Sequence, residues 1–167
     1  MFHTPALDAP DKPGQYAELA AQLRGLLHGE RNRVANAANF AALVYHALPG
    51  LNWCGVYFVD AAVAGGELVL GPFQGKPACV RIAFARGVCG TAAATRTTQL
   101  VPDVNAFPGH IACDSASRSE LVVPLVRADG TLLGVWDVDS PLRARFDERD
   151  RAGMQSLCAI FLQASDG

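Results

Sequence analysis

The sequence predicts an α+β fold in which helices from the two ends of the chain pack on one face of an antiparallel sheet. Two apolar stripes at helical spacing occupy residues 16–48, and a third lies near the C-terminus. Between them, residues 52–139 hold mostly short runs rich in aromatic and β-branched residues. Helices that flank a run of consecutive strands in this order are typical of an α+β domain.

The first two helices are predicted from their apolar stripes. Residues 1–14 contain three prolines and are predicted to form a loose arm, so the single domain is expected to span residues 15–165. Asn32 is a suitable cap for the second helix, and Pro49 and Gly50 end it. The first stripe is Tyr16, Leu19, Ala20, Leu23 and Leu27, and the second is Val34, Ala38, Ala41, Tyr45 and Leu48.

The middle of the chain is predicted to be mainly strands. We expect strands at 52–60, 67–70, 79–83 and 99–101, and a short helix over the small-residue run 90–96. A long loop covers residues 103–119. Strands at 120–127 and 131–139 then form a hairpin, because Asp129-Gly130 is a strong turn signal. Asp147 caps a last helix, whose apolar stripe is Met154, Leu157, Cys158 and Phe161.

Composition excludes several classes of protein. The 167 residues fit one domain, and 14 basic against 16 acidic residues give a net charge of −2. The basic residues form no block, so we expect neither a nucleic-acid nor a membrane partner. No apolar run approaches the roughly 20 residues that a membrane helix needs. The N-terminal segment lacks the basic and apolar parts of a secretory signal, so we expect a cytoplasmic protein.

The five cysteines do not suggest a disulfide framework or a metal site. Their number is odd, no C-x-x-C pair occurs, and the four histidines are scattered, so we expect no metal site. Cys158 lies on the apolar stripe of the last helix and Cys54 lies within an aromatic strand, which favours burial for both.

Three cysteines are candidates for a reactive thiol. Cys89 lies at a predicted helix N-terminus, where free amide groups can stabilise a thiolate. Cys79 begins a predicted strand. Cys113 lies in the loop PGHIACDSASRSE, whose small residues allow the backbone to approach a ligand closely. Each of the three is as readily interpreted as a small buried side chain.

Acidic and aromatic residues converge on the same predicted strands. Asp137 and Asp139 are two residues apart, so they point to one face of their strand, and Glu120 begins the neighbouring hairpin strand. Three carboxylates close together suit an ammonium group or a shared proton, although a solvated strand end is the common alternative. Trp53 and Tyr57 fit either core packing or an aromatic wall for a small apolar group.

Five segments together resemble the free methionine-(R)-sulfoxide reductases, which are stand-alone GAF-domain proteins. The resemblance covers about residues 16–160 and implies a GAF-like fold. The chain departs from the family pattern at Cys54, which leaves an additional disulfide open, and at Trp136. The segments are LNWCGVYF, LGPFQGKPACVRI, RGVCGTAAAT, TQLVPDVNAFPGHIACDSASRSELVVPL and GVWDVDSP.

The resemblance implies a reaction and assigns roles to the three cysteines. The substrate would be free L-methionine-(R)-S-oxide. Cys113 would be the attacking thiolate and would become a sulfenic acid. Cys79 would resolve it to a disulfide, with Cys89 as the competitor, and a thioredoxin-type dithiol would reduce that disulfide. This implied reaction needs no metal and no organic cofactor.

The resemblance also implies a binding site for the substrate. Trp53 and Tyr57 would form the aromatic wall, and the backbone amides of Ile111, Ala112 and Cys113 would face the substrate carboxylate. The acidic contacts would be Glu120, Asp137 and Asp139, with Glu120 or Asp139 as proton donor. A homodimer contact would use the apolar surface of the first two helices. The alternative from another class is a GAF domain that senses a small molecule or a redox state without catalysis.

Overall fold

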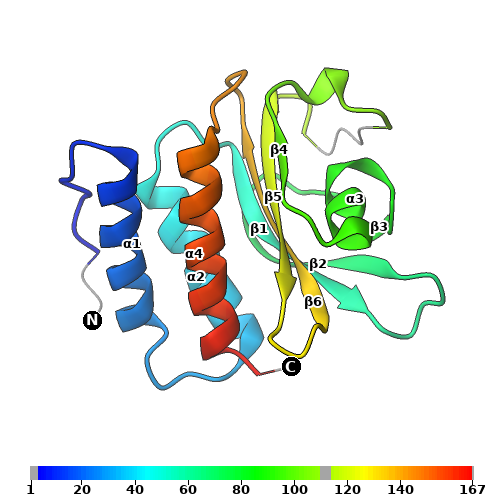
Figure 1. The fold of residues 1–167 in the computed structure, drawn as a ribbon, viewed down its shortest axis with the longest axis horizontal. Coiled ribbons are helices and arrows are strands. Elements are labelled where there is room, and N and C mark those ends of the chain that lie inside the picture. Colours follow the sequence, from blue (N-terminus) through cyan, green and yellow to red (C-terminus); the bar gives the residue numbers. More distant parts are fainter. Residues whose placement is uncertain (1–3, 110–113, 167) are drawn as a thin grey trace.

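A six-stranded antiparallel sheet forms the centre of the computed structural model, which describes residues 4–109 and 114–166 (Figure 1). The strand order is β3-β2-β1-β6-β5-β4. The strands are β1 (Trp53–Asp60), β2 (Glu67–Gly75), β3 (Arg81–Ala83), β4 (Gln99–Val101), β5 (Ser119–Val126) and β6 (Leu132–Ser140). The helices are α1 (Lys12–Leu26), α2 (Arg33–Ala47), α3 (Gly87–Thr95), the short 3₁₀ helix η1 (Val104–Ala106) and α4 (Glu148–Ala164).

The two faces of the sheet carry different layers. Helices α2 and α4 cover one face, and α1 packs on α4 and α2 from the side away from the sheet (Figure 1). The three helices share a continuous apolar core with this face, as the sequence predicted. Helix α3 lies on the opposite face, over a second and smaller apolar cluster. None of the helices in the described part of the chain is long and apolar enough to cross a membrane.

Caps at the helix ends explain where α1, α2 and α4 begin. Asn32 caps α2 through hydrogen bonds from two backbone amides, and Asp147 closes a capping box on α4, as predicted. Helix α1 begins at Lys12, inside the segment predicted to be a loose arm. Asp11 caps it, and Pro13 lies in the first turn, where its missing N–H costs no hydrogen bond.

The apolar stripe predicted for α2 is offset from the buried face. Val34 is 53% exposed and Ala38 is also exposed. The neighbouring positions Ala37, Phe40 and Val44 are buried instead. The error has a physical cause: alanines occupy both faces of this helix, so periodicity alone does not fix its rotation, and the ring of Phe40 does.

The first three strands and α3 differ from their predicted bounds. Strand β2 continues through a Gly- and Pro-containing segment to Gly75, because these residues pair with β1 across an irregularity in register. Strand β3 begins only at Arg81, so Cys79 precedes the strand. Helix α3 begins at Gly87, which places Cys89 inside the helix. The hairpin of β5 and β6 forms as predicted.

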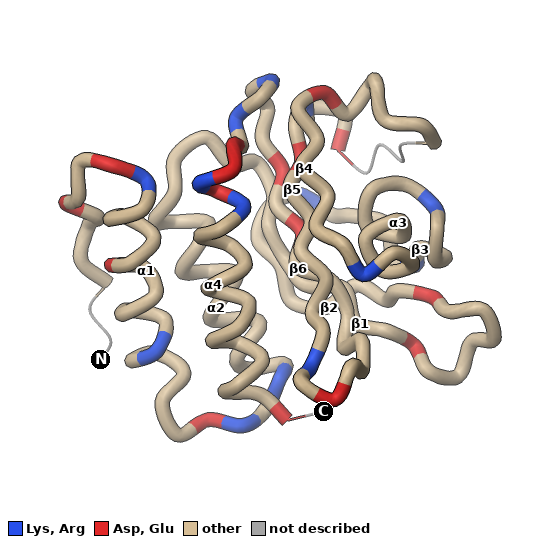
Figure 2. Tube along the Cα trace, viewed as in Figure 1, with Lys and Arg blue, Asp and Glu red and all other residues tan. Residues whose placement is uncertain are grey.

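Alternation along β1 and β6 sends side chains of the core to one face of the sheet and side chains of a cavity to the other. Cys54 and Trp136 point to the long helices, where the Trp136 ring stacks on Phe40 with centroids 3.9 Å apart. Trp53 and Asp137 point to the other face and line a cavity there. Figure 2 shows acidic positions on the strands in the middle of the molecule.

Candidate active site

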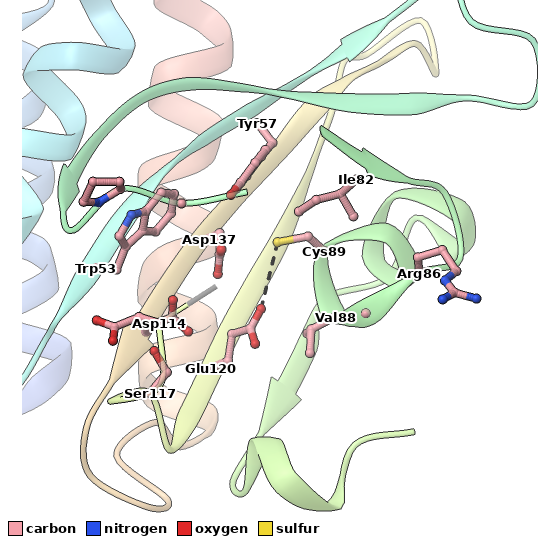
Figure 3. A pocket seen from close by; sticks show the side chains of 14 residues that line it. Trp53, Tyr57, Ile82, Arg86, Val88, Cys89, Asp114, Ser117, Glu120 and Asp137 are labelled. Atoms are coloured by element: carbon pink, nitrogen blue, oxygen red, sulfur yellow. Dashed lines mark hydrogen bonds between the residues drawn. The ribbon is translucent and has the colours of Figure 1, made fainter. Parts of the chain in front are cut away.

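A cavity with about 520 Å³ of empty space lies on the face of the sheet opposite the long helices (Figure 3). Side chains from β1, β5, β6 and α3 line it, together with residues of the connections after β2 and before β5. The lining residues are Trp53, Tyr57, Pro77, Ala78, Ile82, Arg86, Gly87, Val88, Cys89, Asp114, Ser117, Glu120, Asp137 and Asp139.

Aromatic rings form one wall of this cavity. Trp53 and Tyr57 lie four residues apart on β1, so they share a face, and their ring centroids are 5.8 Å apart. Phe73 of β2 also stacks on Trp53, with ring centroids 5.4 Å apart. The indole N–H of Trp53 donates to the carbonyl of Lys76 at 3.1 Å, which fixes the ring. Both Trp53 and Tyr57 are buried, so the wall is rigid and apolar.

Strand pairing brings the three predicted carboxylates together. Glu120 of β5 lies directly opposite Asp139 of β6, and Asp139 lies opposite Trp53 of β1. Asp137 is two residues before Asp139 and therefore points to the same face. Glu120 and Asp137 are each only 6% exposed, and Asp139 is half-buried. The cavity thus presents three acids beside the aromatic wall.

Burial makes these acids easier to protonate than ordinary carboxylic acids. Loss of hydration raises the pKa of Asp137 to about 7. Burial, and then the charge of Asp137, raise the pKa values of Glu120 and Asp139 well above their usual range. Like charges at such short separation cannot all ionise near neutral pH. The cavity therefore holds carboxyl protons where a reaction could use them.

Cys89 faces the acids and not an environment that would favour a thiolate. It is the third residue of α3, and its Sγ lies 3.9 Å from Oε1 of Glu120, to which the thiol donates (Figure 3). Burial, and then the charges of Asp137 and Glu120, raise the pKa of the Cys89 thiol. The expectation that the helix N-terminus would stabilise a thiolate is therefore wrong, because burial and the carboxylates outweigh the helix amides.

The close packing that aims Cys89 at the cavity depends on a glycine. A Cβ atom at Gly90 would lie 2.4 Å from the carbonyl oxygen of Ala83 at the end of β3. Only glycine allows α3 to approach the sheet this closely. The Gly90 amide donates to the carbonyl of Arg86, and the Ala85 amide donates to the Gly90 carbonyl, so both backbone groups are satisfied.

A polar network next to the acids was missed in the sequence. The side-chain amide of Asn52 donates to Asp114 at 3.1 Å and to Ser117 at 3.0 Å. Asp114 also accepts from the Ala116 amide, which lowers its pKa and keeps it ionised. Ser117 in turn hydrogen-bonds Asp139. Asn52 is 62 residues from Asp114, and no local pattern marks their contact.

Of the other two candidate cysteines and the predicted backbone contacts, the structure describes only Cys79. Cys79 is disulfide-bonded and lies half-buried in the connection between β2 and β3. Cys113, Ile111 and Ala112 lie outside the described residues. Cys54, Cys89 and Cys158 are free thiols.

The burial predicted for Cys54 and Cys158 is confirmed. Both lie in the core under the long helices, away from the cavity. The Cys54 thiol donates to the carbonyl of Ala41 at 3.3 Å. The structure thus assigns Cys54 to the core, where it forms no additional disulfide.

One group of side chains has the composition of a metal site. Ligand atoms of Cys89, Glu120 and Asp137 all lie within 4.8 Å of one another. The spacing of the cysteines and histidines predicted no metal site. Cys89, Glu120 and Asp137 come from α3, β5 and β6, so no spacing motif in the sequence joins them.

Comparisons with known proteins agree with this geometry. Residues 23–164 match the model of the GAF domain. The free methionine-R-sulfoxide reductase of Escherichia coli is 47% identical over 144 residues, which are 86% of this chain and 84% of that protein. The enzyme of the same name from Saccharomyces cerevisiae is 46% identical, with 86% and 81% covered. The free methionine-R-sulfoxide reductase of Neisseria meningitidis, solved with its substrate, has a TM-score of 0.91 and 45% identity, with 98% and 95% covered.

Proposed function

Because the chain belongs to the GAF-domain family, and within it to the free methionine-R-sulfoxide reductases, we propose that it reduces free L-methionine-(R)-S-oxide to L-methionine. The observation that carries the proposal is the cavity, in which an aromatic wall and three carboxylates, two of them buried, lie together with Asp114, the residue that follows Cys113 in the chain. Apolar and acidic groups side by side suit a small amino acid with an ammonium group and an apolar side chain.

Each part of the substrate has a suitable partner in the cavity. The rings of Trp53 and Tyr57 would contact the methyl group and the side-chain methylenes. Carboxylates are the natural partners of an ammonium group, and Asp137 and Asp139 would bind it. The amides of Ile111, Ala112 and Cys113 would bind the substrate carboxylate.

The chemical step would use Cys113 as the nucleophile. Its thiolate attacks the sulfoxide sulfur, and the oxygen needs a proton to be transferred. Glu120 or Asp139 would donate that proton, and their raised pKa values support this role. Methionine leaves with its sulfur reduced by two electrons, and Cys113 is oxidised to a sulfenic acid. Cys113 is bonded to Asp114, which lines the cavity, so its position in the chain favours this assignment.

Recycling would pass through a disulfide. The Cys79 thiol would attack the Cys113 sulfenic acid and release water. The oxidised state of Cys79, together with free thiols at the other described cysteines, supports Cys79 as the resolving residue over Cys89. A thioredoxin-type dithiol would supply the two electrons by exchange. We expect this cycle in the cytoplasm, and the homodimer contact through the first two helices remains a prediction.

A coupled assay tests the proposal. Thioredoxin, thioredoxin reductase and NADPH are supplied, and NADPH consumption is followed with free R-sulfoxide, free S-sulfoxide or a blocked peptide sulfoxide. We expect turnover with the free R epimer alone, because recognition of the ammonium and carboxylate groups requires a free amino acid. Equal rates on the peptide would refute the assignment of the substrate, and no turnover with any sulfoxide would favour the sensor alternative.

A further inference from the structure

Cys89, Glu120 and Asp137 present three metal-ligand atoms to one point in the cavity. All three side chains are more than nine-tenths buried, with exposed fractions of 5%, 6% and 6%. Their ligand atoms lie within 4.8 Å of one another, and the sulfur is 3.9 Å from the nearer Glu120 oxygen. They come from three different rigid elements, and Figure 3 shows them converging on the same space.

A second observation indicates that this cluster lacks a ligand. Oδ1 of Asp137 is buried and has no hydrogen-bond partner among the described residues. A buried carboxylate oxygen without a partner is costly, and such atoms in native structures usually mark a site for a ligand or a water. Asp137 lines the cavity, so this oxygen belongs to the wall that a ligand would contact.

The thiol determines which kind of cation would fit. An ammonium group needs only oxygen acceptors, and Mg²⁺ and Ca²⁺ also prefer oxygen ligands. One sulfur with two carboxylates is a donor set for a borderline-soft ion such as Zn²⁺. Zinc bonds of typical length in tetrahedral geometry place sulfur and oxygen about 3.6 Å apart. The observed 3.9 Å requires a contraction of only a few tenths of an ångström.

We propose that Cys89, Glu120 and Asp137 form a reversible binding site for Zn²⁺ that blocks the cavity. The three side chains supply three ligands, and the open cavity leaves a fourth position for water. Binding releases the protons held by the thiol and the acids, since the metal takes their place. The inhibitory consequence rests on the proposed function, because Zn²⁺ would occupy oxygens that the methionine sulfoxide needs.

Cobalt binding to the disulfide form of the full chain tests the site. In that form Cys79 is not available as a thiolate, and Co²⁺ bound to a thiolate gives a charge-transfer band in the near ultraviolet. We expect a band that saturates at one equivalent, that Zn²⁺ removes, and that Mg²⁺ leaves unchanged. Cys89→Ser should abolish it. Cys158→Ser is the matched control, since it removes a buried thiol from the opposite face of the sheet, and it should keep the band.

A second variant keeps the site testable if Cys89→Ser fails to fold. Glu120→Gln retains the thiol, so the band should persist while the affinity for Co²⁺ falls by about tenfold or more. Absence of a band in the wild-type chain, its persistence in Cys89→Ser, or an unchanged affinity in Glu120→Gln would each overturn the site.

Competition separates this inference from the proposed function. Free methionine-(R)-sulfoxide should bleach the cobalt band, because both ligands need Glu120 and Asp137. The S epimer chelates free cobalt equally well but should not bind the cavity, so it is the matched control. A Cys89-dependent band that the R epimer bleaches no more than the S epimer would support the metal site and reject the proposed substrate contacts. Selective bleaching supports both.

Discussion

Replacing Asp137 with asparagine should stabilise the protein near neutral pH. Asparagine keeps the shape of the side chain and removes its charge. That charge is poorly hydrated in the folded protein, because Asp137 is only 6% exposed. Burial raises the pKa of Asp137 from 3.8 to about 7, so the folded state binds a proton there more tightly than the unfolded state. The contribution of Asp137 to the free energy of unfolding is therefore fully present below pH 3.8 and is lost as the pH rises towards 7.

The size of the effect follows from the same pKa values. A rise from 3.8 to about 7 corresponds to a loss of about 4 kcal/mol once the pH exceeds both values. Glu120 and Asp139 share the cavity, and the charge of Asp137 contributes to their raised pKa values. We therefore expect Asp137→Asn to gain about 2–4 kcal/mol at about pH 8 and almost nothing at about pH 4.

Urea unfolding of the disulfide form, followed by tryptophan fluorescence at these two pH values, measures the difference. Asp129→Asn is the control. Asp129 is an exposed turn residue whose pKa is lowered by the Thr131 amide, so its loss should weaken stability at high pH and not at low pH. If Asp137→Asn is no more stable than wild type at about pH 8, or if its gain does not shrink on acidification, the assignment of a buried, hard-to-ionise Asp137 is wrong.

Three further predictions concern the proposed reactive thiols, Glu120 and Trp136. Without reductant, Cys113→Ser should release no methionine, and Cys79→Ser should release about one equivalent and then stall, as quantified by amino-acid analysis. Glu120→Gln should lower kcat by about 10²-fold or more if this acid donates the proton, whereas wild-type kcat would exclude that role. Trp136→Ala should cost about 3–5 kcal/mol of unfolding free energy without changing KM, and a changed KM would show that the helix face contributes to the cavity.

Local signals in the sequence predicted those parts of the fold that depend on local interactions. The caps at Asn32 and Asp147 and the turn at Asp129-Gly130 act within a few residues, and each appears where it was expected. The two-residue spacing of Asp137 and Asp139 sufficed to place both on one face. Pairing of the hairpin strands then placed Glu120 opposite Asp139.

Features that depend on tertiary contacts were missed or misjudged. The extension of β2 to Gly75 is held by pairing with β1 against the local preference of glycine and proline. The environment of Cys89 depends on acids from two strands that follow it in the chain, and these reverse the effect expected from its helix. The contact of Asn52 with Asp114 joins residues 62 positions apart, which no periodicity reveals.

The alternation of β6 explains how one sheet can hold a destabilising cavity and remain folded. Trp136 faces the long helices and is fully buried against Phe40, whereas Asp137, the next residue, faces the cavity. A shift of one residue in register would exchange these faces and place carboxylates in the apolar core, so the pattern strongly specifies the register. The apolar core on the helix face can therefore offset the free-energy cost of burying acids on the opposite face of the sheet. Burial can then raise the pKa values of Glu120, Asp137 and Asp139 without competing for the same contacts that stabilise the fold.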